Sequence, residues 1–181
     1  MENYRISDDS AVYFVTFTVV EWLPVFVSEV ACKIVTDSLT FCHENKGLRT
    51  NACVIMPTHL HAIVFHEEFR ADPLKAALAD LRKFTGRQLS DFCAKRAPAC
   101  FVETLRNASG PDRERRFWQQ TRHPESIDTE PFWRQKLDYL HDNPRRKGLV
   151  RRPEHWRFSS ALYYSSDGRD DWEVPISRIA W

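Results

Sequence analysis

Runs of β-branched and aromatic residues predict three β-strands in the first third of the chain. Residues 11–20 (AVYFVTFTVV) form the first run and residues 48–56 (LRTNACVIM) the second. Pro57 ends the second run, and the third strand, residues 60–65 (LHAIVF), follows after a very short turn. We therefore predict that the second and third strands pair as an antiparallel hairpin.

Apolar residues at helical spacing predict three longer helices. The first covers residues 28–45, with Ser28 able to cap its start and Gly47 following its end. The second covers residues 73–90, and the third covers residues 130–142, ending before Pro144 because the residue before a proline disfavours helical dihedrals. The positions expected to face inward in the first two helices are Val30, Ile34, Leu39, Phe41, Leu74, Leu78, Leu81 and Phe84.

The remaining segments are shorter and less regular. Residues 91–116, which include the turn-rich NASGPDRERR, are expected to form a mobile insertion. Residues 117–120 (FWQQ) are expected to be extended, a short helix is expected near residues 159–164, and residues 165–181 form a C-terminal extension. We interpret residues 1–181 as one α+β domain with an antiparallel sheet.

Composition fits a globular chain, since 43% of residues are hydrophobic and 28% are charged. No apolar run approaches the roughly 20 residues that span a bilayer, and the polar N-terminus does not look like a secretory signal. We therefore expect a cytoplasmic protein without a membrane partner. The five cysteines form no CxxC pair and are expected to be reduced and mostly buried.

The formal net charge is only +1, so bulk charge does not indicate nucleic-acid binding. Basic residues nevertheless cluster locally, and such clusters are equally typical of ordinary solvated surfaces. We consider seven of these basic residues and one aromatic neighbour, Trp118, candidates for DNA contact. The basic residues are Lys83, Arg87, Arg115, Arg116, Arg145, Arg146 and Lys147. Trp118 could instead belong to the core.

The first chemical motif is MPTHLH, residues 56–61. Side chains alternate across a strand, so His59 and His61 face the same side while Leu60 faces the other. Two imidazoles on one face can bind one divalent metal ion. Taken alone, so short a motif is more often two histidines that flank a core leucine.

The second motif is LDYLHDNP, residues 137–144, in the third predicted helix. At 100° per residue, Tyr139 lies about 100° from Leu140 and about 160° from Leu137, which places it off a buried stripe formed with Trp133. Asn143 follows one turn later on the same face as Tyr139. The amide oxygen of Asn143 can complete a metal site with the two histidines. Alone, Tyr139 would be interpreted as an amphipathic residue at the edge of the core.

Together the two motifs indicate phosphoryl-transfer chemistry. Mg²⁺ or Mn²⁺ accepts imidazole beside oxygen ligands and can polarise a phosphate oxygen. A tyrosine can attack phosphorus and later leave again, which suits strand transfer better than hydrolysis.

The sequence resembles the REP-associated tyrosine transposases and their insertion-sequence relatives, which are HUH nucleases. The resemblance runs from about Tyr13 to Tyr164 through YFVTFTV, VIMPTHLHAIV, FWQQTRHPE, KLDYLHDNPRRKGLV and FSSALYY. It departs from the family at Thr58, where asparagine is common, and in the more basic segment 145–147. A threonine hydroxyl can also hold a turn, and the extra charge could strengthen phosphate contact.

The resemblance implies a ferredoxin-like (RRM-like) sheet with helices packed on one face and the tyrosine helix beside it. It implies His59 and His61 as the metal pair, Asn143 as third ligand, and Tyr139 as the nucleophile that forms a 5′-phosphotyrosine link. The implied substrate is single-stranded DNA that carries hairpins, and both a monomer and a homodimer fit. Two other hypotheses stay open: a noncatalytic RRM-like binding domain, and a metal-dependent hydrolase that uses water.

Overall fold

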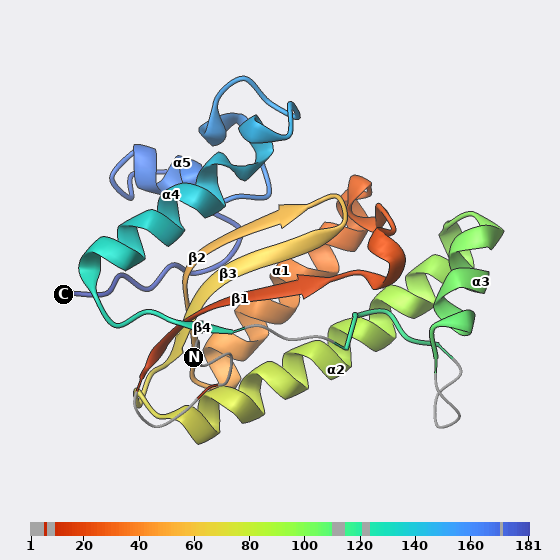
Figure 1. The fold of residues 1–181 in the computed structure, drawn as a ribbon, viewed down its shortest axis with the longest axis horizontal. Helices are drawn as coiled ribbons and strands as arrows, with labels where there is room; N and C mark the ends of the chain where they lie inside the picture. Colours follow the sequence, from red (N-terminus) through yellow and green to blue (C-terminus); the bar gives the residue numbers. More distant parts are fainter. Residues whose placement is uncertain (1–5, 7–9, 110–114, 121–123, 171) are drawn as a thin grey trace.

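The computed structural model describes residues 6, 10–109, 115–120, 124–170 and 172–181. They form an α+β fold built on one four-stranded sheet (Figure 1). The strands are β1 (Val12–Thr18), β2 (Leu48–Met56), β3 (His59–His66) and β4 (Glu125–Ser126). The helices are α1 (Glu29–Asn45), α2 (Ala71–Arg96), α3 (Ala99–Asn107), α4 (Glu130–Arg146) and α5 (Ala161–Ser165), with short 3-10 turns η1 (Val20–Trp22), η2 (Val25–Val27) and η3 (Pro153–His155).

The strand order is β2-β3-β1-β4, and all neighbouring strands are antiparallel. This is the order of a ferredoxin-like sheet, and the predicted hairpin of β2 and β3 is confirmed. Thr16 of β1 lies opposite His61 of β3, and Thr18 lies opposite His59. The register therefore brings threonines of β1 alongside both histidines of the MPTHLH motif.

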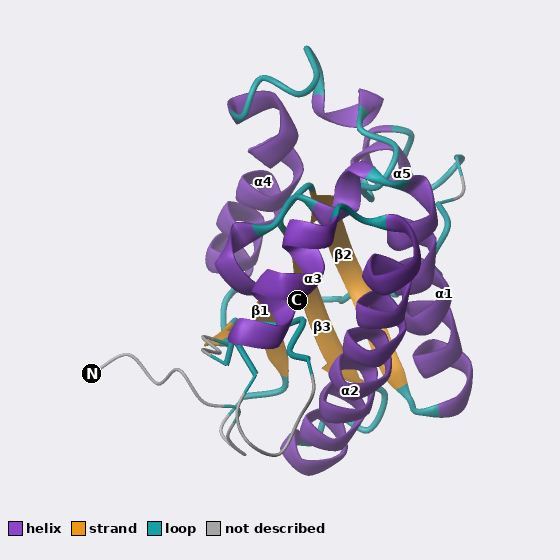
Figure 2. Ribbon diagram, turned by 90° about the vertical axis from the view of Figure 1, so that its right-hand side faces the viewer, coloured by secondary structure: helices purple, strands orange, loops and turns teal. Residues whose placement is uncertain are grey.

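Helices cover both faces of the sheet, so the prediction that they pack on one face is wrong in this detail. Figures 1 and 2 show α1 and α2 on one side of the strands and α4 on the other. The cause is that successive residues of β3 are apolar on both faces: Ala62 and Val64 join the core beneath α1 and α2, whereas Ile63 and Phe65 join a second core with Leu140 of α4.

The helices differ from the predicted ranges in three places. The predicted irregular segment 91–116 is mostly helical, because α2 continues to Arg96 and α3 follows almost at once, while residues 110–114 lie outside the described part. The end predicted before Pro144 is also wrong. Pro144 is buried within the last turn of α4, where its missing N–H removes a single bond and the packing keeps the turn helical.

Several apolar side chains predicted to face inward are exposed. Val30, Phe41 and Phe84 are each at least half exposed, at 50%, 55% and 55%. The buried face of α1 is instead made of smaller residues such as Ala31, Cys32 and Val35, which allow α1 to lie close to the sheet and α2. Leu39, Leu74, Leu78 and Leu81 are buried as predicted and Ile34 packs against the core, so spacing found most of the stripe but misplaced its edges.

Two further expectations can be compared with the structure. Cys32, Cys42, Cys53 and Cys93 are free and buried, whereas Cys100 is free and exposed. Of the helices in the described ranges, none combines the length and the apolar character needed to cross a bilayer.

We predict that Gly47→Ala destabilises the fold more than Gly148→Ala. Both glycines have positive φ, +64° and +71°, which costs an alanine about 1 kcal/mol. A Cβ at Gly47 would also lie 2.6 Å from Nε2 of His66, whose ring is fixed by hydrogen bonds to the Lys46 carbonyl and the Glu68 amide. Overpacking there should add about 1 to 3 kcal/mol.

The control is Gly148, because a Cβ at Gly148 has no atom within 4 Å. Urea denaturation of both variants measures the difference in unfolding free energy. Equal losses would mean that the His66 ring moves aside freely.

Candidate functional site

The site begins with the two histidines of β3, which share the face of the sheet covered by α4. The ring centroids of His59 and His61 lie 4.6 Å apart at an interplanar angle of 71°. His61 is 7% exposed and His59 is half-buried. The predicted alternation is confirmed, because Leu60 between them is buried in the opposite core.

A threonine hydroxyl contacts the Nδ1 atom of each histidine. Oγ1 of Thr16 lies 2.8 Å from Nδ1 of His61, and Oγ1 of Thr58 lies 2.9 Å from Nδ1 of His59. When Nδ1–H donates to the hydroxyl oxygen, the lone pair of each ring is on Nε2. Such partners orient metal-binding histidines and fix their tautomer. Thr58, the departure from the family pattern, thus contacts the histidine itself.

Both imidazoles are neutral at pH 7. Burial lowers the pKa of His59 to about 4, and the positive charge of Lys147 adds to the shift. Burial lowers the pKa of His61 to about 3, with further contributions from His59 and Lys136. A neutral imidazole has a free lone pair, which metal coordination requires.

Tyr139 projects from α4 toward this histidine pair. Its ring centroid lies 5.6 Å from that of His61 and 6.1 Å from that of Phe14, both in edge-on arrangements. The residue is 40% exposed, so it is not sealed in the interior. The guanidinium carbon of Arg146 lies 5.7 Å from the Tyr139 ring centroid. The phenol, the cation and the imidazole therefore meet at one place.

A polar cavity of about 250 Å³ opens beside the tyrosine. It is lined by Phe14, Thr16, His61, Gln135, Lys136 and Tyr139, with Glu125 at its edge. Nζ of Lys136 lies 2.5 Å from a carboxylate oxygen of Glu125 and 5.0 Å from the Phe14 ring centroid. The cavity could admit the backbone of a nucleic acid next to the phenol.

Asn143 lies one turn after Tyr139, and its side chain is buried at 5% exposure. Its Nδ2 atom has no hydrogen-bond partner among the described residues. Buried amide groups normally have a hydrogen-bond partner, so the lack of one at Asn143 suggests a site for a bound group. Rotation of the amide by 180° would exchange its nitrogen and oxygen and turn the oxygen toward that group. Within the described ranges, no group of three or more His, Cys, Asp or Glu side chains could hold a metal ion. The amide oxygen of Asn143 is therefore the candidate for a third metal ligand beside the two histidines.

A buried asparagine anchors α4 on the sheet. Asn51 is the extra residue of a β-bulge between Thr50 and Ala52, and it is fully buried. Its Oδ1 accepts a 2.7 Å hydrogen bond from the indole of Trp133, and its Nδ2 donates to the carbonyl of Ser177. Trp133 was predicted only as part of the buried apolar stripe. Its indole N–H also donates a hydrogen bond to the sheet, which helps to position α4 and Tyr139.

The basic residues at the end of α4 lie near the site. Arg146 contacts the Tyr139 ring, and Lys147 lies close enough to His59 to lower its pKa. Arg145 is paired with Asp142 at 2.5 Å. These are the predicted DNA-contacting residues that the structure brings to the candidate site.

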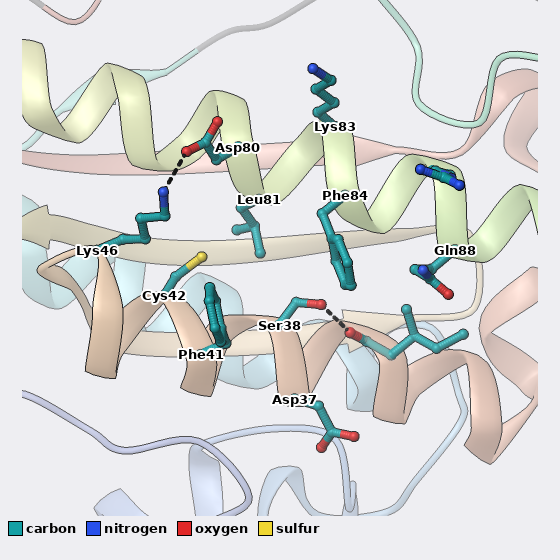
Figure 3. Close-up of a pocket in the computed structure, with 12 residues that line it drawn as sticks. Asp37, Ser38, Phe41, Cys42, Lys46, Asp80, Leu81, Lys83, Phe84 and Gln88 are labelled. Carbon is teal, nitrogen blue, oxygen red and sulfur yellow. Dashed lines mark hydrogen bonds and ion pairs between the residues drawn. The ribbon is translucent and has the colours of Figure 1, made fainter.

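Lys83 and Arg87 lie elsewhere. They line an apolar groove of about 700 Å³ between α1 and α2, on the side of the sheet away from the histidines. Figure 3 shows the rings of Phe41 and Phe84 in this groove and Lys83 extending away from it. The groove contains no cluster of reactive groups comparable with the histidine–tyrosine site, so we do not place the chemistry there.

The remaining candidates near residue 116 have structural roles. Trp118 is 4% exposed and its indole donates a 3.0 Å hydrogen bond to Thr85, so of the two alternatives for this residue, DNA contact and a place in the core, the structure supports the core. The indole lies in the core because residue 118 pairs with Val19, and this pairing directs the ring inward. Arg115 is bonded to the Ser90 carbonyl and the Asp91 carboxylate, and Arg116 is half-buried.

Sequence reasoning missed Thr16 and Asn51 because their roles depend on strand pairing. Thr16 acts on His61 through the β1–β3 register, and Asn51 is turned toward α4 by the bulge. A polar asparagine within an otherwise apolar strand was the signal available for Asn51.

Comparison with known proteins supports the fold. A solved structure of a REP-associated tyrosine transposase bound to a REP hairpin superposes with a TM-score of 0.68 at 18% identity, over 99% of this chain and 96% of that chain. A putative transposase from Deinococcus radiodurans R1 gives a TM-score of 0.49 at 15% identity, over 78% of this chain and 97% of that chain. No protein-family model and no curated protein sequence matches. The fold is therefore that of a REP-associated tyrosine transposase, as predicted from the motifs.

We predict that Trp133→Phe destabilises the protein by about 1 to 3 kcal/mol, because the buried Oδ1 of Asn51 loses its donor. The matched control is Trp172→Phe, whose indole donates to the carbonyl of Arg157 near the surface, where water can replace it. Urea denaturation compares the two. Equal losses would argue that the Asn51 contact does not anchor α4.

Proposed function

We propose that the protein is a transposase that cleaves and rejoins single-stranded, hairpin-bearing DNA through Tyr139. The observation that carries the proposal is the edge contact between the rings of Tyr139 and His61, beside a second neutral histidine. A structural tyrosine has no need of two adjacent neutral imidazoles. The transposase-like fold and the hairpin bound by its structural relative support the same substrate class.

The reaction begins with the hydroxyl of Tyr139, a residue that lines the cavity and is 40% exposed. The phenolic oxygen attacks the phosphorus of the strand and loses its proton to water. The bond between phosphorus and the 3′ oxygen breaks, and that oxygen takes up a proton. The products are a 5′-phosphotyrosine link and a free 3′-hydroxyl. Attack by another 3′-hydroxyl on the link reverses these steps and rejoins DNA.

His59, His61 and Asn143 would hold a divalent cation, Mg²⁺ or Mn²⁺. The neutral imidazoles, their threonine partners and the buried Asn143 amide, whose Nδ2 has no hydrogen-bond partner among the described residues, fit this role. When bound, the cation would polarise a phosphate oxygen and offset charge in the transition state. Arg146 and Lys147 would attract the adjoining phosphates.

We predict that Tyr139→Phe abolishes a covalent protein–DNA adduct. The test uses single strands that flank the gene and can fold into hairpins, incubated with Mg²⁺ and resolved on a denaturing gel. Tyr163→Phe is the matched control, because Tyr163 belongs to α5 rather than to the cavity.

Each of the other outcomes rejects the proposal in a distinct way. An adduct that survives Tyr139→Phe rejects the assigned nucleophile. Free 5′-phosphate products that do not depend on Tyr139 indicate hydrolysis by water. Tight binding without cleavage, unaffected by substitution of His59 or His61, indicates a binding domain.

We predict that Thr16→Val weakens Mn²⁺ binding by about 10- to 100-fold, the range typical of lost partners of metal ligands. The valine keeps the strand but removes the hydroxyl that contacts Nδ1 of His61. Titration calorimetry measures the affinity. Thr104→Val is the control, because it removes a hydroxyl that donates to the Cys100 carbonyl within α3 rather than to a histidine of β3. Unchanged Mn²⁺ affinity in Thr16→Val would contradict the assigned metal site.

A further inference from the structure

The segment that follows β1 has an unusual backbone. Glu21 and Trp22 have φ angles of 50° and 54°, in the left-handed region that side chains other than glycine rarely adopt. They are the only two adjacent residues of this kind in the described part of the chain. Such strain persists only where the surroundings enforce it, and it gathers at functional sites.

The surroundings of this segment do enforce it. The amide of Val19 donates to the Thr58 carbonyl at 2.9 Å, and the amide of Phe26 donates to the Pro57 carbonyl at 3.0 Å. The amide of Val20 donates to the Phe117 carbonyl at 2.9 Å. Val20 and Phe26 are buried, so the segment is fixed at both ends. Two of these hydrogen bonds join the segment to Pro57 and Thr58, the turn directly before His59.

Between these fixed ends, Trp22 projects from the surface. It is 58% exposed, although tryptophan is usually largely buried. Its ring meets the His59 ring with a centroid distance of 5.7 Å and an interplanar angle of 80°. The histidine contact restrains the indole without covering it. A strained backbone thus holds a large aromatic surface beside the candidate metal pair.

We propose that the Trp22 indole is a stacking platform for an unpaired base of the DNA strand, next to the position of cleavage. This inference rests on the proposed function. Every base has a flat face, so one fixed indole can hold any of them. Lys147, whose charge acts on His59 from the end of α4, would meet the phosphate beside the stacked base. Stacking there would hold the strand in place as its phosphate reaches Tyr139.

The position of Trp22 distinguishes it from other exposed aromatic side chains. Phe84 lies in the groove on the other side of the sheet. Trp181 is 44% exposed, but its ring contacts Trp133 rather than either histidine. Trp181 is therefore a matched control: an exposed tryptophan on the same molecule, away from the candidate site.

The experiment uses the Tyr139→Phe protein, so that binding is measured without cleavage. The probe is a short thymidine homopolymer carrying a fluorescent label, and fluorescence anisotropy gives its affinity. Trp22→Ala should weaken binding by about 10-fold, the effect typical of a lost stacking contact. Trp22→Phe should retain most of the affinity, and Trp181→Ala should match the parent protein.

A second measurement locates the contact. The same probe with one 5-iodouracil is irradiated, and mass spectrometry identifies the crosslinked residue. We expect Trp22. Unchanged affinity in a folded Trp22→Ala protein, with crosslinks only at other aromatic residues, overturns the inference. Thermal melting checks folding, and the crosslinking measurement, which uses the protein with Trp22 intact, tests the inference if the alanine variant is unstable.

These outcomes separate the inference from the proposed function. A crosslink at Trp22 without any Tyr139 adduct in the unmodified protein would reject the nuclease and keep the stacking platform. An adduct at Tyr139 with unchanged binding by Trp22→Ala would keep the nuclease and reject the platform.

Discussion

The antiparallel register between β1 and β3 is the constraint on which the site depends. It sets Thr16 opposite His61 and Thr18 opposite His59, so that a hydroxyl of β1 reaches Nδ1 of His61. A shift of one residue would move every side chain of β3 to the other face. The histidines would then enter the core beneath α1 and α2, and Leu60 would face α4. Because the rest of β3 is apolar on both faces, the cost of burying the two polar imidazoles in that core is what favours this register.

The second constraint is the position of α4, which is fixed by polar as well as apolar contacts. Leu137 and Leu140 pack on the sheet, but apolar packing tolerates small sliding movements. The hydrogen bond between Asn51 and Trp133 has a defined direction, and its acceptor, Asn51, is fully buried. A buried polar link of this kind suits a helix whose tyrosine is proposed to attack a phosphate. The bulge at Asn51 thus helps to position Tyr139 by holding α4 near its first turn, at Trp133.

Local motifs allowed much of this to be predicted from the sequence. The MPTHLH segment combined a proline, a short turn and alternation, which sufficed to place both histidines on one face. The angular position of Tyr139 relative to Leu140 sufficed to place it off the buried stripe. What failed depended on tertiary contacts. Phe84 was expected to be buried but is exposed on α2, whereas Trp118, a candidate for DNA contact, is buried. The indole is buried because residue 118 pairs with Val19, which turns the ring inward.

The electrostatics of the site are local, and this bears on how a strand would be held. With a net charge of +1, the chain offers no general attraction for a polyanion. Cations gather at the end of α4, but Arg145 is paired with Asp142, and Lys136 is paired with Glu125. Few free charges therefore face the cavity, and phosphate contacts alone would give little affinity. Contacts that do not depend on charge must contribute, and an aromatic surface fixed beside His59 is suited to that role.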